Sequence, residues 1–210
     1  MYSKTTQTKG TLPAIAIRGI APFPSTDVRT EVGRSVSKQA LLEAERNHDN
    51  HVFLLVQQDP VIEEPTEKDM LPVGVVAKIG IKIKLPNGNF KVKFDPIVRA
   101  KIEHIDQMEP FIQTQFETMP TVQNDVDEEI ALVRVIVKMV MDNSQGVLNN
   151  PKQTVEMIQS GVSSDKLADV VASNLKIAEK DKFKYIETAV LEDRLNYLIQ
   201  DIEKEKHMNE

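Results

Sequence analysis

The hydrophobic pattern changes its period once along the chain, near Pro120, and this change limits the possible folds more than any other feature. Before it, short runs alternate apolar and polar residues or are rich in β-branched residues, which is typical of strands. After it, apolar residues recur every three or four positions, as in amphipathic helices. The sequence therefore predicts a β-rich unit followed by an all-helical unit. A chain of 210 residues is long enough for both.

The first part is expected to form about six strands and one or two helices. The strand-like runs lie at 12–19, 26–33, 51–57, 73–85, 89–94, 98–105 and 111–119. A helix is predicted over 35–48, where apolar residues share one face and Ser35 can cap the first turn. Three X-Pro pairs make the segment 59–72 a turn-rich excursion. The first ten residues are polar and predict a disordered tail.

The second part is expected to form a bundle of roughly four helices that ends in a long one. Asp125, followed by Glu128, is typical of a capped helix start. The helix that follows is apolar around most of its circumference, so the other helices are expected to bury it. Pro151 and Ser164 start two further helices, and Gly161 ends the first of these. Leucine and isoleucine at heptad spacing indicate a final bundle helix: Leu191, Leu195, Leu198 and Ile202.

The segment KIKLPNGNFKVKF, residues 82–94, predicts a hairpin with a two-residue turn at its Asn-Gly pair. In that register four lysines share one face and form a basic patch: Lys82, Lys84, Lys91 and Lys93. Like charges directly opposite each other are unfavourable. Three explanations stay open: a solvated edge that discourages pairing with other chains, cover by the acidic helical part, or attraction of acidic ligands.

Charge is distributed unevenly. The whole formal net charge of −6 lies after residue 123, whereas residues 78–101 carry a local +6. The longest apolar stretch, 130–141, is interrupted by Arg134 and Lys138, so no membrane span is expected and the protein is predicted to be soluble. The absence of cysteine suits a reducing cytoplasm and excludes disulfides and thiolate chemistry.

No catalytic, cofactor-binding or metal-binding residue is predicted. None of the eight glycines is followed by lysine, which excludes a Walker A phosphate loop, and there is no G-x-S-x-G elbow. His48 and His51 lack a third ligand for a metal, so two solvated loop histidines are the favoured interpretation. Glu63 and Glu64 form a carboxylate pair without a nearby base or nucleophile, and a solvated surface is favoured for them too.

A series of motifs is spaced as in one known family. They are LPAIAIRGIAPFP at 12–24, VGR at 32–34, QDP at 58–60, VGVVAKI at 73–79 and LPNG at 85–88. These segments resemble the N-terminal substrate-binding domain of bacterial Lon proteases, and residues 165–205 are similar to the helical region that follows it. The resemblance spans about 11–206 and implies a PUA-like β pseudo-barrel lobe at 11–119 and an α-helical bundle at 124–206.

The resemblance also implies a function. Lon is an ATP-driven hexameric protease, and its N-terminal region is expected to hold unfolded or damaged protein substrates and to help arrange the hexamer. ATP, magnesium and the Ser-Lys dyad belong to AAA+ and protease modules that this sequence does not contain, so the chain is expected to be a non-catalytic fragment. Two alternatives stay open: a stand-alone substrate-binding-domain protein, and a PUA-like module that binds DNA or another acidic polymer through its lysines.

Mixed apolar and basic surface can hold unfolded segments by burial and weak charge attraction. A substrate surface is therefore predicted on the first lobe. Its members are Phe23, Arg34, Lys38, Met70 and Leu71. The alternative is that Phe23 belongs to the core.

Overall fold

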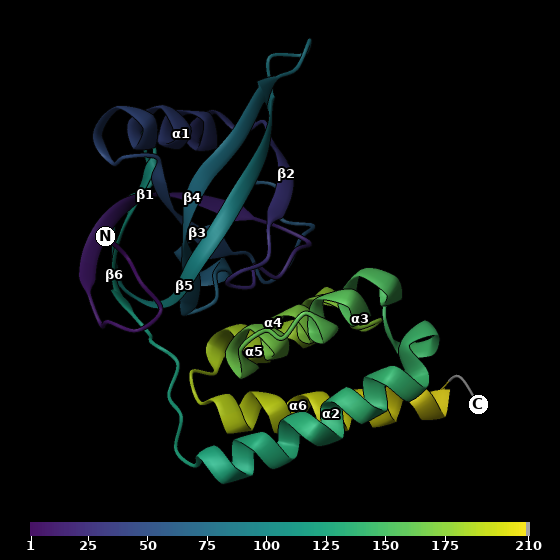
Figure 1. The fold of residues 1–210 in the computed structure, drawn as a ribbon. Coiled ribbons are helices and arrows are strands. Elements are labelled where there is room, and N and C mark those ends of the chain that lie inside the picture. Colours follow the sequence, from purple (N-terminus) through teal and green to yellow (C-terminus); the bar gives the residue numbers. More distant parts are fainter. Residues whose placement is uncertain (209–210) are drawn as a thin grey trace. The chain divides into compact units, whose positions relative to one another are not determined.

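Six strands and one α-helix build the first of two units into which the computed structural model divides (Figure 1). The structure describes residues 1–208, and this first unit spans Met1–Pro120. Its elements are β1 (Lys9–Ile17), β2 (Val28–Val32), α1 (Ser35–Asn47), β3 (His51–Val56), β4 (Val73–Lys84), β5 (Phe90–Gln107) and β6 (Ile112–Thr118), with a 3-10 turn at Glu67–Asp69. The α+β fold expected from the sequence is confirmed.

The strands close into a ring. β1 pairs in parallel with β3 and antiparallel with β6, while β4 joins β3 to β5. β5 is 18 residues long, so its second half also reaches β6 and completes the ring, and its first half pairs with β2. Within the described residues, β2 lies at the end of the strand order and pairs with β5 alone, so one of its edges is open.

Two hydrophobic clusters fill this unit. One lies between the ring and α1, where Ala40, Leu41 and Ala44 pack against buried residues of the strands. The other surrounds the Phe53 and Phe116 rings, whose centroids are 5.2 Å apart. Each fully buried large apolar side chain contributes roughly 1.5–3 kcal/mol, and the alternating pattern of the strands supplies these side chains to the interior.

The prediction of a disordered tail over residues 1–10 is wrong. β1 already begins at Lys9, and the Thr8 amide donates a 2.7 Å hydrogen bond to the hydroxyl of Thr118. The Tyr2 ring packs against Phe116 with a centroid separation of 5.7 Å. A single aromatic side chain in a polar run gives no periodic signal, so sequence pattern alone could not reveal this anchor.

The hairpin between β4 and β5 has a register one residue away from the predicted one. Lys84 lies opposite Phe90, and Lys82 lies opposite Val92. The Gly88 amide bonds to the Leu85 carbonyl at 3.0 Å, and Gly88 has φ +84°. These features form a three-residue loop, because proline at 86 suits the first central position of a type I turn and glycine takes the left-handed position after it.

The predicted basic patch therefore does not lie on one face. A one-residue shift turns alternate side chains to opposite faces, so Lys82 and Lys84 lie on one face of the hairpin and Lys91 and Lys93 on the other. Lys82 pairs with Glu45 at 2.5 Å, and Lys93 pairs with Asp95 at 2.8 Å. Acidic groups of the same unit thus compensate two of the four lysines.

The second unit, from Thr121 onward, is helical, and its part up to residue 208 is described. Its helices are α2 (Val126–Val147), α3 (Pro151–Gln159), α4 (Ser164–Asn174), α5 (Phe183–Glu187) and α6 (Leu191–Met208), with a 3-10 turn at Glu179–Lys182 before α5. Asp125 caps α2 as predicted, since its carboxylate accepts from the amides of Asp127 and Glu128. α4 begins at Ser164 as predicted, with Ser163 as its N-cap. The cap predicted at Ser35 is one residue late, because Arg34 occupies the N-cap position of α1.

The expectation that most of α2 is buried is also wrong. Ile136 and Val140 are among its few buried residues, whereas Val126, Ile130 and Val135 are exposed. α2 packs mainly against α6 and α3, so one side of an apolar helix stays in contact with solvent.

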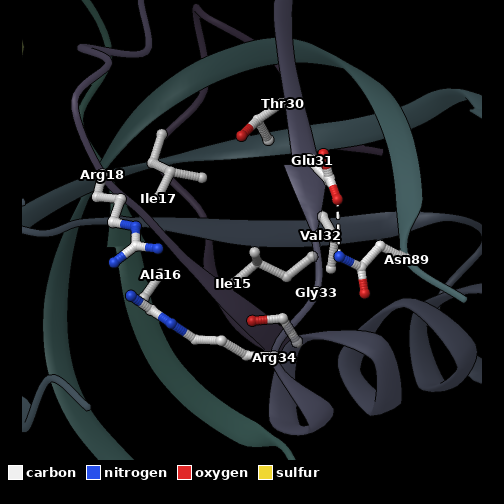
Figure 2. A pocket seen from close by; sticks show the side chains of 11 residues that line it. Ile15, Ala16, Ile17, Arg18, Thr30, Glu31, Val32, Gly33, Arg34 and Asn89 are labelled. Carbon is white, nitrogen blue, oxygen red and sulfur yellow. Dashed lines mark hydrogen bonds between the residues drawn. The ribbon is translucent and has the colours of Figure 1, made fainter. Parts of the chain in front are cut away.

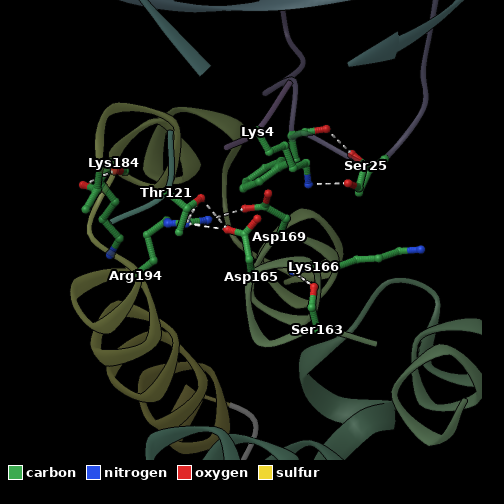
Figure 3. A network of polar contacts seen from close by, with 12 residues as sticks. Lys4, Ser25, Thr121, Ser163, Asp165, Lys166, Asp169, Lys184 and Arg194 are labelled. Carbon is green, nitrogen blue, oxygen red and sulfur yellow. Dashed lines mark hydrogen bonds and ion pairs between the residues drawn. The ribbon is translucent and has the colours of Figure 1, made fainter. Parts of the chain in front are cut away.

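A buried arginine joins three segments of the helical unit (Figure 3). Arg194 of α6 is 0% exposed and donates to Asp165 at 2.7 Å, to Asp169 at 2.9 Å and to the hydroxyl of Thr121 at 3.1 Å. Both carboxylates belong to α4. A charge at this depth is tolerated only when it is paired and hydrogen-bonded, so the network fixes how α6 packs on α4.

Candidate functional site

Two arginines mark the most distinctive surface of the first unit. Arg18 directly follows β1, and Arg34 lies between β2 and α1. Both side chains line two cavities, of about 490 Å³ and about 590 Å³, which also share Ala16 and Ser37. Figure 2 shows the two guanidinium groups turned toward each other at the wall of the first cavity. The ends of two elements thus bring together residues that are 16 positions apart in sequence.

The position of Arg34 is supported by a buried amide. Its guanidinium donates a 3.2 Å hydrogen bond to the side-chain oxygen of Gln57, which is itself buried. The side-chain nitrogen of Gln57 donates to the carbonyls of Asp59 and Ile62 at 2.6 and 2.7 Å. Gln57 therefore links Arg34 to the loop that follows β3, and the loop holds the amide in the orientation that Arg34 needs.

The two guanidiniums repel each other electrostatically. Burial, and then the nearby charge of Arg18, hold the pKa of the Arg34 guanidinium below its usual value. An arginine nevertheless stays charged at neutral pH. Within residues 1–208, the side chain of Arg18 makes no hydrogen bond or ion pair. Two like charges therefore line the same cavity, and no carboxylate within residues 1–208 forms an ion pair with either of them.

The first cavity lies beside the open edge of β2. Thr30, Glu31 and Val32 of this strand form one wall, and the last residues of β1 form the other. The side chains of Asn89 and Asn87 donate to Glu31 at 2.7 and 3.3 Å, and these bonds lower the pKa of its carboxyl group. Glu31 is thus engaged by the hairpin loop and not by either arginine.

The second cavity has walls of mixed character. Apolar side chains come from Ala16, Val36, Pro65, Met108 and Ile112. Three exposed carboxylates also line it: Glu63, Glu64 and Glu109. Neither arginine forms an ion pair with any of the three, so the acids leave the Arg18 and Arg34 guanidiniums accessible.

The structure separates the residues predicted to form a substrate surface. Phe23 is 0% exposed, Met70 is 6% exposed and Leu71 is 7% exposed, so the prediction that they present apolar surface is wrong. The alternative that Phe23 belongs to the core is confirmed. Arg34 lines both cavities, while the half-buried Lys38 lies in the first turn of α1 and lines neither. A role for these two residues in binding stays a prediction.

Arg18 was missed as a candidate, although it belongs to the LPAIAIRG motif. Its only sequence signal was a charge directly after an apolar strand and before a glycine, which is also common at any strand end. Exposed apolar side chains were missed as well: Ile81 and Ile83 on β4 are 56% and 55% exposed. Within residues 1–208, no three side chains are arranged to hold a metal ion, and no helix has the length and apolarity to cross a membrane.

Comparison with known proteins extends over both units. The model of the family described as the ATP-dependent protease La (LON) substrate-binding domain matches residues 11–204. The chain belongs to this family. It is 34% identical over 193 residues to the Lon protease of the Aster yellows witches'-broom phytoplasma (strain AYWB), and 32% identical over 202 residues to Lon protease 1 of Bacillus subtilis (strain 168).

These relatives are much longer than the matched region. The alignments cover 91% and 96% of this chain but only 24% and 26% of the two Lon proteases. The chain thus spans about a quarter of the length of the curated relatives that it matches. The matched part is the substrate-binding region of the Lon family and not the ATPase or protease region.

Solved structures confirm the fold. The N-terminal domain of a Lon protease from the Mycobacterium avium complex has a TM-score of 0.75 at 15% identity, with coverage of 92% of this chain and 98% of that one. A Lon N-terminal domain protein from Xanthomonas campestris has a TM-score of 0.64 at 10% identity, with coverage of 91% and 98%. A β lobe followed by helices is therefore shared at low sequence identity.

Proposed function

We propose that this chain recruits unfolded or damaged polypeptides for an ATP-dependent protease of the Lon type. The observation that carries the proposal is the family match over 11–204, which includes both units. Recruitment requires a surface that accepts many sequences, and the cavities at Arg18 and Arg34 combine apolar walls, two cations and an adjoining open strand edge. Such a surface can gain from apolar burial and from charge without demanding one sequence.

The helical unit is proposed to assist assembly of the protease ring. Support comes from the exposed apolar residues of α2, including Val126, Ile130 and Val135. Exposed apolar patches of this kind are typical of interaction sites. ATP and magnesium would act in an AAA+ module of the full-length protease, and the chain alone is predicted to hydrolyse neither ATP nor casein.

The proposal is tested by binding of a permanently unfolded protein, such as reduced and carboxymethylated α-lactalbumin, to the full 210-residue chain. Fluorescence anisotropy should show saturable binding of the unfolded protein and none of the native, disulfide-bonded form. Lysozyme at the same concentration serves as a control for unspecific adhesion. Equal binding of the native and unfolded forms, or no binding of either, would reject recruitment by this chain.

A further inference from the structure

We infer that Arg18 and Arg34 together bind a carboxylate carried by an extended segment of the recruited polypeptide, which lies in the cavity along β2. The inference rests on the proposed function and adds the chemical group that the site recognises. Its basis is the geometry of the two guanidiniums, which are turned toward each other at the wall of the first cavity (Figure 2).

The guanidinium pair lacks an anion of its own. Arg34 has only the neutral Gln57 amide as a side-chain partner, and Arg18 has no side-chain partner within residues 1–208. Elsewhere in this unit, cations close to a carboxylate do form pairs, as Lys82 does with Glu45 and Lys93 with Asp95. A carboxylate between the arginines would relieve their repulsion and accept charge-assisted hydrogen bonds from two planar donors, which is the geometry that arginine provides for carboxylates.

The occupant is an extended polypeptide because one wall of the cavity is a free strand edge. Residues 28–32 make no backbone hydrogen bond outside their ladder with β5 within the described chain. The amides and carbonyls on the outer side of β2 are therefore free to pair with an added strand, a common mode of peptide recognition. A volume of about 490 Å³ lies within the range of ligand-binding pockets.

The acids of the second cavity restrict which segments fit. Glu63, Glu64 and Glu109 would repel a segment with carboxylates along its whole length. The site therefore favours a segment with one carboxylate at the arginines and apolar or basic residues beyond it. The carboxylate can come from an acidic side chain or from the C-terminus of the polypeptide, and both present the same group to the arginines.

The test uses the full 210-residue chain and three fluorescein-labelled 12-residue peptides rich in valine, threonine and serine. One has a single central glutamate and an amidated C-terminus, one has glutamine instead, and one has glutamine with a free C-terminal carboxylate. The glutamate peptide should bind about tenfold more tightly than the glutamine peptide, and its binding should weaken with added salt. Tight binding of the third peptide would assign the site to C-terminal carboxylates.

Arg18→Gln is the decisive variant, because removal of this side chain breaks no hydrogen bond or ion pair within residues 1–208. It should reduce the preference for glutamate over glutamine to less than twofold. Arg29→Gln is the matched control: Arg29 is an exposed arginine of β2 that pairs with Asp27 and lines neither cavity. Thermal unfolding of both variants verifies that the fold is kept.

The outcomes separate this inference from the proposed function. Equal binding of the glutamate and glutamine peptides to the unaltered chain, or equal losses in the two variants, would overturn the inference. If no peptide binds, the unfolded protein of the recruitment assay replaces them: binding that Arg18→Gln leaves unchanged would overturn the carboxylate site while recruitment stands. If the unfolded protein does not bind to the unaltered chain, both the carboxylate site and the proposed recruitment function are rejected.

Discussion

Replacement of Arg194 by methionine should lower the free energy of unfolding of the helical unit far more than a substitution at its surface does. Methionine fills a similar volume but offers no donor, so three hydrogen bonds to Asp165, Asp169 and Thr121 are lost (Figure 3). The Asp169 side chain is only 1% exposed and cannot turn to water without local opening. Breaking a buried charge pair in this way costs about 3–5 kcal/mol.

The measurement is urea unfolding, monitored by tyrosine fluorescence and by far-UV circular dichroism. The chain contains no tryptophan, and two of its three tyrosines, Tyr185 and Tyr197, lie in the helical unit. For a unit of this size, a loss of 3 kcal/mol also lowers the melting temperature by at least about 12 °C. Arg134→Met on the exposed side of α2 is the matched control and should change the free energy of unfolding by less than about 0.5 kcal/mol.

A second substitution distinguishes a lost charge pair from lost packing. Adding Asp169→Leu to Arg194→Met removes the carboxylate left in the interior, and apolar replacements of buried ion pairs are often neutral or stabilising. The double variant should therefore recover most of the loss. A cost below about 1 kcal/mol for Arg194→Met, or strictly additive costs in the double variant, would refute the view that this network holds α6 on α4.

Three further predictions concern the β lobe. Gly88→Ala should lower its free energy of unfolding by about 1 kcal/mol, since glycine alone adopts φ +84° there without strain; unchanged urea midpoints would contradict the loop geometry. The pKa of Glu31 is lowered by its bonds to Asn89 and Asn87, so its contribution to stability is present above the unfolded-state pKa and is lost as pH falls through the folded value. An NMR titration midpoint at or above the ordinary glutamate value would contradict this. Lys84→Glu should change the free energy of unfolding by less than about 0.5 kcal/mol, because Lys84 lies opposite Phe90 and not opposite a lysine. A clear stabilisation would instead support the register of the two-residue turn, in which Lys84 lies opposite Lys91.

Local signals in the sequence predicted most of the elements. The change of period near residue 120 coincides with the division between the two units, because strands and helices each impose their own spacing on a buried face. Asp125 predicted the start of α2 because an N-cap depends on neighbouring residues only. The heptad residues from Leu191 to Ile202 are all buried, as their spacing predicted.

What the sequence could not predict depends on tertiary closure or on competition between local rules. The Asn-Gly pair favours a two-residue turn, but proline at position 86 fits the three-residue loop better, and one residue of shift moved the lysines to opposite faces. Phe23 lies near the end of the motif at 12–24, between two prolines, and this position gives no indication of its burial. The meeting of Arg18 with Arg34 arises only when β1 and β2 take their places around β5 and the ring.

The open edge of β2 is a hazard that its own sequence limits. An exposed strand edge invites pairing with other copies of the chain, and short length and charged side chains reduce that risk. β2 has five residues, of which Arg29 and Glu31 are charged and exposed. Each net main-chain hydrogen bond contributes only about 0.5–1.5 kcal/mol, so five residues hold an added strand weakly. The arginine pair would then decide which segments remain bound, because the short edge alone holds them only weakly.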